Sequence, residues 1–288
     1  MRAAVRVARA HGIDADPLVL HEGVNVLVHL RPAPVVARVA TLTAAVRAGG
    51  AERWLAREVA VAAHAAARGA PVAAPSALLA PGPHVEDGLA LTFWALVPHD
   101  PDRTPGDREL GASLRRVHEA LADHDGELPP SGGLLDEAHA ILADVAVDGA
   151  PAPGDAGVLA RAWERLASLG EAGPAQALHG DAYLRNVLAT AAGPVWIDLE
   201  DTCRGPREWD LACLLTPPAV RGAGPERDAV LAGYGLPVDA AAMERLMEAR
   251  AYQVVAWTLL AERARRSEPG RAQPWIRWLA ARAEAATA

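Results

Sequence analysis

The first hundred residues consist of short apolar runs separated by polar turns, a pattern typical of strands joined by tight connections. Apolar and arginine residues alternate over residues 2–11, and Gly12 follows, which predicts a short amphipathic helix. Three β-rich runs come next, at residues 18–20, 24–30 and 35–40. Glu22-Gly23 and an Arg-Pro-Ala-Pro turn separate these runs, so the sequence predicts a three-stranded meander.

A helix and a buried strand complete this first part of the chain. Residues 51–68 are rich in alanine and end at Gly69, as expected of a helix, and a Pro/Ala loop follows at residues 71–83. The run GLALTFWALV at residues 88–97 is strongly apolar and predicts a buried strand. A Pro-His-Asp-Pro sequence breaks it, and residues 100–155 then hold thirteen acids but only four arginines. We therefore predict a boundary here, between lobes of residues 1–97 and 98–288.

The second part of the chain shows helical periodicity. Helices are expected at residues 110–121, 134–147, 158–169, 207–215, 228–234, 240–265 and 274–286. His118, Trp275 and Trp278 lie on these helices, and core packing is the simpler interpretation of all three, with a ligand role left open. Taken with the first part, this pattern predicts an α+β protein whose second lobe is mostly helical.

One hairpin interrupts these helices and carries the polar residues of chemical interest. Val187-Leu188 and Val195-Trp196-Ile197 are short apolar runs joined by a turn. Asp181 and Asn186 precede the first run, and Asp198 follows the second. All three side chains are therefore expected at one end of the hairpin. Carboxylate and amide oxygens are hard ligands, so the sequence predicts a Mg²⁺ site there.

Composition narrows the classes of function. All 28 basic residues are arginine, so any mechanism that needs a lysine is excluded. The 36 acids give a net charge of −8, which disfavours nonspecific nucleic-acid binding and mildly favours a cationic ligand. The two cysteines lack zinc-site spacing, and we find neither a signal peptide nor an apolar run long enough to span a bilayer. A cytoplasmic protein with no membrane partner is expected.

Two features of the first part bear on anion binding. Arg38 stands alone among small aliphatic residues on the third predicted strand, where an unpaired charge would be costly. We expect it to pair with Glu58 on the predicted helix or with a phosphate, although a surface arginine on an edge strand is the alternative. Gly23 and Asn25 form a turn whose backbone N–H groups can bind phosphate, although a plain hairpin turn is the simpler interpretation.

The motifs together resemble a known family. HGDxxxxN at residues 179–186, IDLE at residues 197–200 and DLA at residues 210–212 form a combination similar to that of the aminoglycoside phosphotransferase and choline kinase-like small-molecule kinases. The resemblance covers nearly the whole chain. It implies a two-lobed, protein-kinase-like fold with a small β-rich N-lobe that carries one main helix, and a larger, mostly helical C-lobe.

The resemblance also implies roles for the motif residues. Asp181 would accept a hydrogen bond from the substrate hydroxyl, Asn186 and Asp198 would bind Mg²⁺ on the ATP phosphates, and GTP in place of ATP stays open. His179 and Asp210 would support the loop. The chain departs from the kinase pattern at Arg38, which replaces the strand lysine, and at Tyr183, where protein kinases often have a lysine. Arg185 either supplies charge to the phosphoryl group or faces solvent.

The remaining expectations concern the two ligands. The adenine ring of ATP is expected against the connection between the two lobes, called the hinge, beside Trp94 and the backbone of Ala95, Leu96 and Val97. The acceptor is expected near Tyr183, Glu200, Asp201, Tyr252 and Trp257. The resemblance favours an aminoglycoside or other antibiotic, and the acidic residues 100–155 suit a polyamine. Choline-like or amino alcohols, sugars and nucleoside antibiotics stay open, as do a catalytically silent binding protein, a metal-dependent hydrolase, and a monomer or homodimer.

Overall fold

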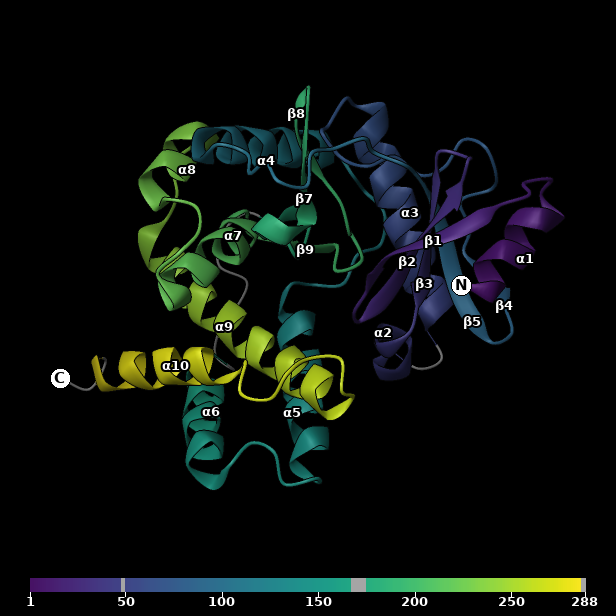
Figure 1. Ribbon diagram of the computed structural model, residues 1–288. Helices are drawn as coiled ribbons and strands as arrows, with labels where there is room; N and C mark the ends of the chain where they lie inside the picture. Colours follow the sequence, from purple (N-terminus) through teal and green to yellow (C-terminus); the bar gives the residue numbers. More distant parts are fainter. Residues whose placement is uncertain (48–49, 167–174, 286–288) are drawn as a thin grey trace.

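The computed structural model describes residues 1–47, 50–166 and 175–285, which form two lobes, an N-lobe on the right of Figure 1 and a C-lobe on the left. The N-lobe is built on a five-stranded antiparallel sheet in the order β1-β2-β3-β5-β4. Its strands are β1 (Asp16–Glu22), β2 (Asn25–Arg31), β3 (Val35–Ala40), β4 (His84–Glu86) and β5 (Leu89–Ala95). The predicted meander and the buried strand are therefore confirmed. Strand β4 and the short helix α2 (Leu42–Val46) were missed.

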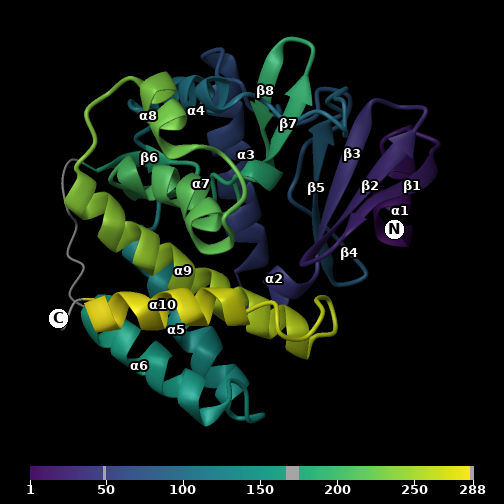
Figure 2. The same cartoon turned by 60° about the vertical axis from the view of Figure 1, so that its left-hand side comes forward.

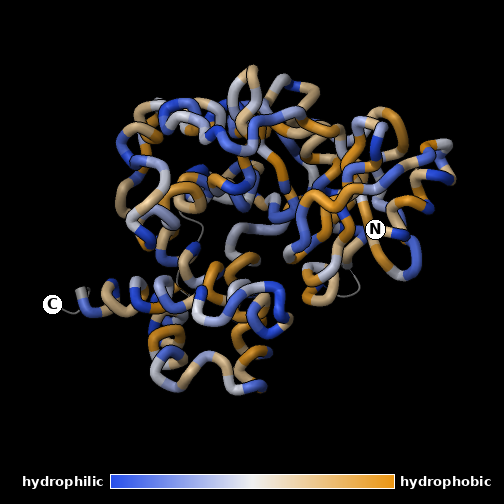
Figure 3. The backbone as a smooth tube through the Cα atoms, in the orientation of Figure 1, coloured by the Kyte–Doolittle hydropathy of each residue, from blue (hydrophilic) through white to orange (hydrophobic). Residues whose placement is uncertain are grey.

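The two faces of the sheet pack against different helices, because side chains alternate along each strand. On one face, Ala37 and Val39 pack in a cluster with Val7 of α1 (Arg2–Ala10). On the other face, Ala40 packs with Trp54 and Leu55 of α3 (Ala51–Ala67). Figure 3 shows hydrophobic residues running through the strands of this lobe. Arg38 belongs to the second face and so points toward α3 and the C-lobe.

The C-lobe is mostly helical, as predicted. Its helices are α4 (Asp107–Leu121), α5 (Gly132–Ala146), α6 (Pro153–Leu166), α7 (Glu208–Arg221), α8 (Arg227–Tyr234), α9 (Ala240–Arg263) and α10 (Gln273–Ala285). Two short sheets pair β6 (Gln176–Leu178) with β9 (Cys203–Gly205) and β7 (Val187–Thr190) with β8 (Gly193–Trp196). The second of these is the predicted hairpin. Parts of two predicted helices, at residues 167–169 and at residue 286, lie outside the described residues.

One predicted helix end is wrong. The helix α7 continues to Arg221 through Pro217 and Pro218, whereas the pattern placed its end at Leu215. The prolines lack backbone N–H groups, so two helical hydrogen bonds are lost. The last turn is closed instead by the Gly222 N–H, which donates to the Pro218 carbonyl at 2.7 Å. Among the described residues, no helix is long and apolar enough to cross a membrane.

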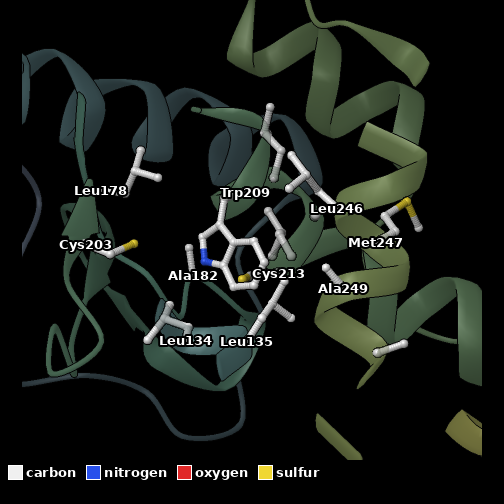
Figure 4. Packing of buried hydrophobic residues seen from close by; sticks show 14 of the residues in the cluster. Leu134, Leu135, Leu178, Ala182, Cys203, Trp209, Cys213, Leu246, Met247 and Ala249 are labelled. Carbon is white, nitrogen blue, oxygen red and sulfur yellow. The ribbon is translucent and has the colours of Figure 1, made fainter. Parts of the chain in front are cut away.

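The core of the C-lobe surrounds Trp209 on α7, which is 1% exposed. Figure 4 shows its indole among Leu134, Leu135, Ala182 and Cys213, with α9 on the far side. The indole N–H donates to the Gly180 carbonyl at 2.8 Å, so this core side chain also holds the loop of His179, Gly180 and Asp181, called the HGD loop below. Cys203 and Cys213 are both buried and free.

A seam of backbone hydrogen bonds joins the two lobes, which lie close together also in the turned view of Figure 2. The loop at residues 71–75 exchanges bonds with Trp196 of β8: the Trp196 N–H donates to Pro71 at 2.7 Å and the Ala73 N–H donates to Trp196 at 2.8 Å. The Ala74 carbonyl of the same loop accepts a hydrogen bond from the Ala95 N–H of β5 at 3.0 Å. The predicted Pro/Ala loop is thus the connection between the two sheets. The lobe boundary after Val97 stays a prediction.

Asp210 on α7 holds the HGD loop in place from beneath. Its carboxylate accepts the Gly180 N–H at 2.8 Å, the His179 N–H at 2.9 Å and the His118 Nε2–H at 2.8 Å. His118 in turn bonds to the Tyr234 hydroxyl at 2.7 Å through Nδ1. His118 is therefore the packed helix histidine that the sequence favoured. Burial alone would raise the pKa of Asp210, but these hydrogen bonds and charges hold it below its usual value.

The lowered pKa of Asp210 predicts a pH-dependent loss of stability in Asp210→Asn. The asparagine keeps one acceptor but sets an NH₂ group against a donor, and losing a hydrogen bond to a charged acceptor costs ~1.5–3 kcal/mol. Because the folded-state pKa lies below the unfolded value of 3.8, this stabilisation is present above that value and is lost as the pH falls. Urea unfolding should show the full difference at pH 7 and a smaller one near pH 3. A difference that does not change with pH would contradict a charged Asp210.

Candidate active site

Gly180 allows the HGD loop to pass close to the segment that follows the hairpin. Its φ is +89°, and a Cβ at this position would lie 1.8 Å from the Asp201 carbonyl oxygen. A side chain is therefore excluded by both conformation and space. The loop and the Asp198–Asp201 segment are held side by side, which brings the separate motifs of the sequence into one site.

His179 is fully buried and orients the HGD loop. Its Nδ1 accepts the Asp181 N–H at 3.3 Å, and its Nε2–H donates to the Ile197 carbonyl at 3.0 Å. Burial lowers the pKa of His179, so the ring is neutral at pH 7, with its proton on Nε2. The ring thus ties Asp181 to the end of the hairpin, where Asp198 follows Ile197.

Asp181 lies on this loop with both carboxylate oxygens engaged. The Asn186 amide donates to Oδ2 at 3.0 Å and to the Asp181 carbonyl at 2.9 Å, and the Arg250 guanidinium donates to Oδ1. The side chain is 20% exposed. Burial raises the pKa of Asp181 to about 7 even though Arg250 opposes the shift. Each oxygen keeps a second lone pair, so the carboxylate can still accept a hydrogen bond from a hydroxyl group.

Arg250 was missed by the sequence analysis. It lies on α9, is buried, and also donates to Gln253 at 2.6 Å. A signal was present, because Met243, Met247, Arg250 and Val254 recur at helical spacing, so an arginine occupies a core-facing position. Burial lowers the pKa of an arginine, but the nearby carboxylate of Asp181 more than restores it. A buried cation at such a position needs a carboxylate partner, which the sequence does not identify.

Arg38 is paired with three carboxylates from both lobes. Its Nη1 donates to Glu58 at 2.6 Å, and its Nη2 donates to Glu200 and lies 3.0 Å from Asp198 Oδ1. The expected contact between Arg38 and Glu58 is therefore confirmed, and the edge-strand alternative is wrong. Burial raises the pKa of Glu58 to about 7 and that of Glu200 to about 8. Three acids around one base leave an excess of negative charge.

The oxygens nearest this excess suit a hard divalent cation. Asp198 has φ +65°, and its buried Oδ1 accepts no hydrogen bond in the described part of the chain. The Asn186 side chain directs its NH₂ group to Asp181, which leaves its Oδ1 for a cation. No group of three or more His, Cys, Asp or Glu side chains within the described ranges is placed to bind a metal. Asn186 and Asp198 therefore fit Mg²⁺ that takes its other ligands from water and phosphates.

The first of two cavities lies between the lobes and has a volume of about 580 Å³. Arg38, Glu58, Asn25, Trp94 and residues 95–97 line it, together with Arg185, Asn186 and Asp198. Gly23 lies at the β1–β2 turn beside this cavity, whose wall there is Val24. The Asn25 side chain accepts from the Thr43 hydroxyl at 2.7 Å and donates to Glu200 at 3.1 Å, so it braces the turn.

The hinge offers one free backbone donor to this cavity. The Ala95 N–H is taken by the Ala74 carbonyl at 3.0 Å, and the Leu96 N–H by the Pro34 carbonyl at 2.9 Å. The Val97 N–H has no acceptor among the described residues. Of the three hinge residues expected to meet the base, Val97 is therefore the one able to donate from its backbone.

The second cavity, of about 440 Å³, lies between the catalytic loop and helices α7, α9 and α10. Asp181, Tyr183, Asp201 and Trp257 line it, and their contact with an acceptor stays a prediction. Glu200 also lines it, but its carboxylate is bonded to Arg38 and Asn25. Tyr252 is different: it is 1% exposed, and its hydroxyl bonds to His139 Nδ1 at 2.8 Å. The expectation for Tyr252 is therefore wrong, because this residue faces the α5–α9 core and lies on the far side of its helix from Trp257.

The two cavities meet at the catalytic loop. Val24, Tyr183, Arg185 and Asp198 line both of them. Trp275 also reaches the second cavity although it is 2% exposed, so this tryptophan is mainly a core residue, as expected.

Comparisons with known proteins agree with this arrangement. A search of curated proteins finds no match. The fold is similar to that of the amicoumacin kinase hAmiN solved with AMP-PNP, Ca²⁺ and Ami (12% identity, TM-score 0.69, 95% of this chain and 92% of that one). It is also similar to aminoglycoside phosphotransferase APH(3'')-Id from Streptomyces rimosus with ADP and streptomycin (19%, 0.64, 88% and 99%). A third neighbour is the microcompartment-associated aminopropanol kinase (17%, 0.66, 97% and 94%).

These neighbours support the two-lobed, kinase-like fold. The model of the "Phosphotransferase enzyme family" matches residues 22–249, which include the Arg38, HGD and Asp198 segments and Asp210. The chain therefore belongs to the phosphotransferase enzyme family.

Proposed function

We propose that this phosphotransferase moves the γ-phosphoryl group of ATP to a hydroxyl group of a small molecule. The observation that carries the proposal is the position of the catalytic loop, where a nucleotide-sized cavity and a second cavity share residues 24, 183, 185 and 198. Asp181 lines the second cavity and Asn186 the first. A donor and an acceptor in these two cavities would meet beside Asp181.

In this mechanism, Asp181 positions the acceptor hydroxyl and takes its proton late in the transfer. Arg250 favours the carboxylate form, and Asn186 and His179 fix its orientation. Arg185 lines both cavities and is exposed, so it can supply positive charge to the transferring group. Asn186 and Asp198 would hold Mg²⁺, which neutralises phosphate charge when bound. Arg38 keeps unused N–H groups for phosphate, because Glu58 and Glu200 take one each.

The acceptor is an antibiotic, such as an aminoglycoside, or another small alcohol. The known neighbours span both groups, since they include kinases of amicoumacin and aminopropanol. One reason to favour a polyamine was the acidic segment at residues 100–155. No residue of that segment lines the second cavity, however, so this reason does not hold. We also propose a cytoplasmic monomer or homodimer that uses ATP, with GTP as the alternative donor.

Asp181→Asn tests the proposed role of the loop. The amide keeps the size of the side chain but cannot take a proton, so transfer should fall by ~10²–10⁴-fold. The measurement is phosphate transfer from labelled ATP, with Mg²⁺, to a panel of hydroxyl compounds. Thermal unfolding of the variant serves as the control for folding. Transfer that the substitution leaves undiminished, or no transfer to any acceptor by the unaltered protein, would contradict the proposal.

Val97→Pro tests the position of the base. Proline removes the free N–H of residue 97, and the loss of one hydrogen bond of ~1–1.5 kcal/mol should weaken ATP binding by ~5–10-fold. The matched control is Val97→Ala, which keeps the N–H and should bind ATP almost as well as the unaltered protein. Equal ATP affinities of the two variants by calorimetry would place the base elsewhere.

Asp198→Asn tests the metal site. Asn186 is neutral, so the substitution removes the only charge on the two proposed ligands, and the Mg²⁺ concentration for half-maximal transfer should rise by ~10-fold or more. The same titration of Glu58→Gln is the comparison, because Glu58 contacts Arg38 and has no proposed contact with the metal. A larger shift in Glu58→Gln than in Asp198→Asn would reverse this assignment.

A further inference from the structure

Two exposed arginines and two tryptophans are among the side chains that line the second cavity. Arg221 ends α7, Arg271 lies just before α10, and Trp257 and Trp275 come from α9 and α10. The Arg221 guanidinium carbon lies 5.4 Å from the centre of the Trp275 ring. Both arginines are exposed, and neither makes an ion pair or a side-chain hydrogen bond within the described part of the chain. The part of the cavity lined by Arg221, Arg271, Trp257 and Trp275 is called the arginine end below.

Three of the four carboxylates that line the same cavity already have a cationic partner. Asp181 is paired with Arg250 and Glu200 with Arg38. Asp201 lies 2.6 Å from Arg47, which also binds Glu137 at 2.7 Å. These existing cationic partners reduce the attraction of the three acids for an ammonium group on a ligand.

The fourth carboxylate, Asp198, is reserved for the phosphate-bound cation in the proposed mechanism. It lies 3.0 Å from Arg38 and lines both cavities. The excess negative charge of the cavity therefore lies at the Arg38 cluster, where the cation would bind. The arginine end contributes two cations that pair with no carboxylate of the described residues.

We propose that the arginine end binds an anionic group, such as a carboxylate, on the acceptor alcohol, while Trp257 and Trp275 pack against its apolar body. Guanidinium groups suit this task because they bind carboxylates through paired N–H groups. An ammonium group in the same place would meet Arg221 and Arg271 and be repelled. The inference rests on the proposed function and names its substrate class: a hydroxy acid or a similarly anionic alcohol is favoured over a polyamine.

A pair of aromatic alcohols that differ in one charge tests this inference. The probes are 3-[4-(hydroxymethyl)phenyl]propanoate and the corresponding propylamine, added to the full chain with Mg²⁺ and a non-hydrolysable ATP analogue. Binding is followed by tryptophan fluorescence. The carboxylate probe should bind ~10-fold more tightly than the ammonium probe, and the difference should shrink with added salt. Equal affinities, tighter binding of the ammonium probe, or no binding of the carboxylate probe would overturn the inference.

Variants locate the effect. Arg221→Gln together with Arg271→Gln should remove the preference for the carboxylate, whereas Arg245→Gln, at an exposed position of α9 outside the cavity, should keep it. If the arginines serve only helix α7 and the Trp275 packing, the double variant will unfold at a lower temperature with its preference intact, which would also overturn the inference.

A transfer assay with ATP on the same probes separates the two proposals. A preference for the carboxylate probe without any phosphate transfer would support the arginine end and contradict the kinase reaction. Transfer to the ammonium probe in preference to the carboxylate probe would support the kinase reaction and contradict the proposed role of the arginine end.

Discussion

The buried guanidinium of Arg38 lies between carboxylates that come from α3 and from the segment after the hairpin. Burial would lower the pKa of this group, but the charges of Glu200, Glu58 and Asp198 outweigh that effect. Because Arg38 pairs with carboxylates of both lobes, it fixes the N-lobe sheet relative to the Asp198–Asp201 segment. Asn25 extends the same network to the β1–β2 turn through Glu200. The nucleotide cavity is therefore shaped by an ion cluster whose net charge is negative and which a divalent cation would complete.

This cluster also shows how far the sequence could predict the site. A buried arginine on an apolar strand requires an anion, and this made Glu58 one of the expected partners of Arg38, beside a phosphate. The spacing of Asp181, Asn186 and Asp198 likewise predicted that these side chains lie close together, because the hairpin between Asn186 and Asp198 is short. Glu200 was assigned to the acceptor, yet its carboxylate is bonded to Arg38 and Asn25. The sequence shows that a charge needs a partner but not which of several nearby carboxylates provides it.

Contacts between residues far apart in the sequence could not be predicted in this way. Arg250 reaches Asp181 across 69 positions, and Arg47 reaches Asp201 across 154. Helical periodicity indicates that residue 250 faces the core, but the identity of what it meets depends on how α9 crosses α7. Tyr252 is the opposite case, since it was expected in the acceptor cavity and lies in the core. It lies two residues from Arg250 and five from Trp257, so the turn of the helix carries it to another side, against His139 and Trp163.

The backbone seam between the loop at residues 71–75 and the two sheets differs in kind from the Arg38 cluster. Its bonds join main-chain N–H and C=O groups of Pro71, Ala73, Ala74, Ala95 and Trp196. Main-chain groups are the same in every residue except proline, which lacks the donor. The junction of the lobes is thus insensitive to most changes of side chain at Ala73, Ala74 and Ala95. Sequence drift in this loop can alter the wall of the nucleotide cavity, to which Ala73 contributes, while the lobes stay joined in the same way.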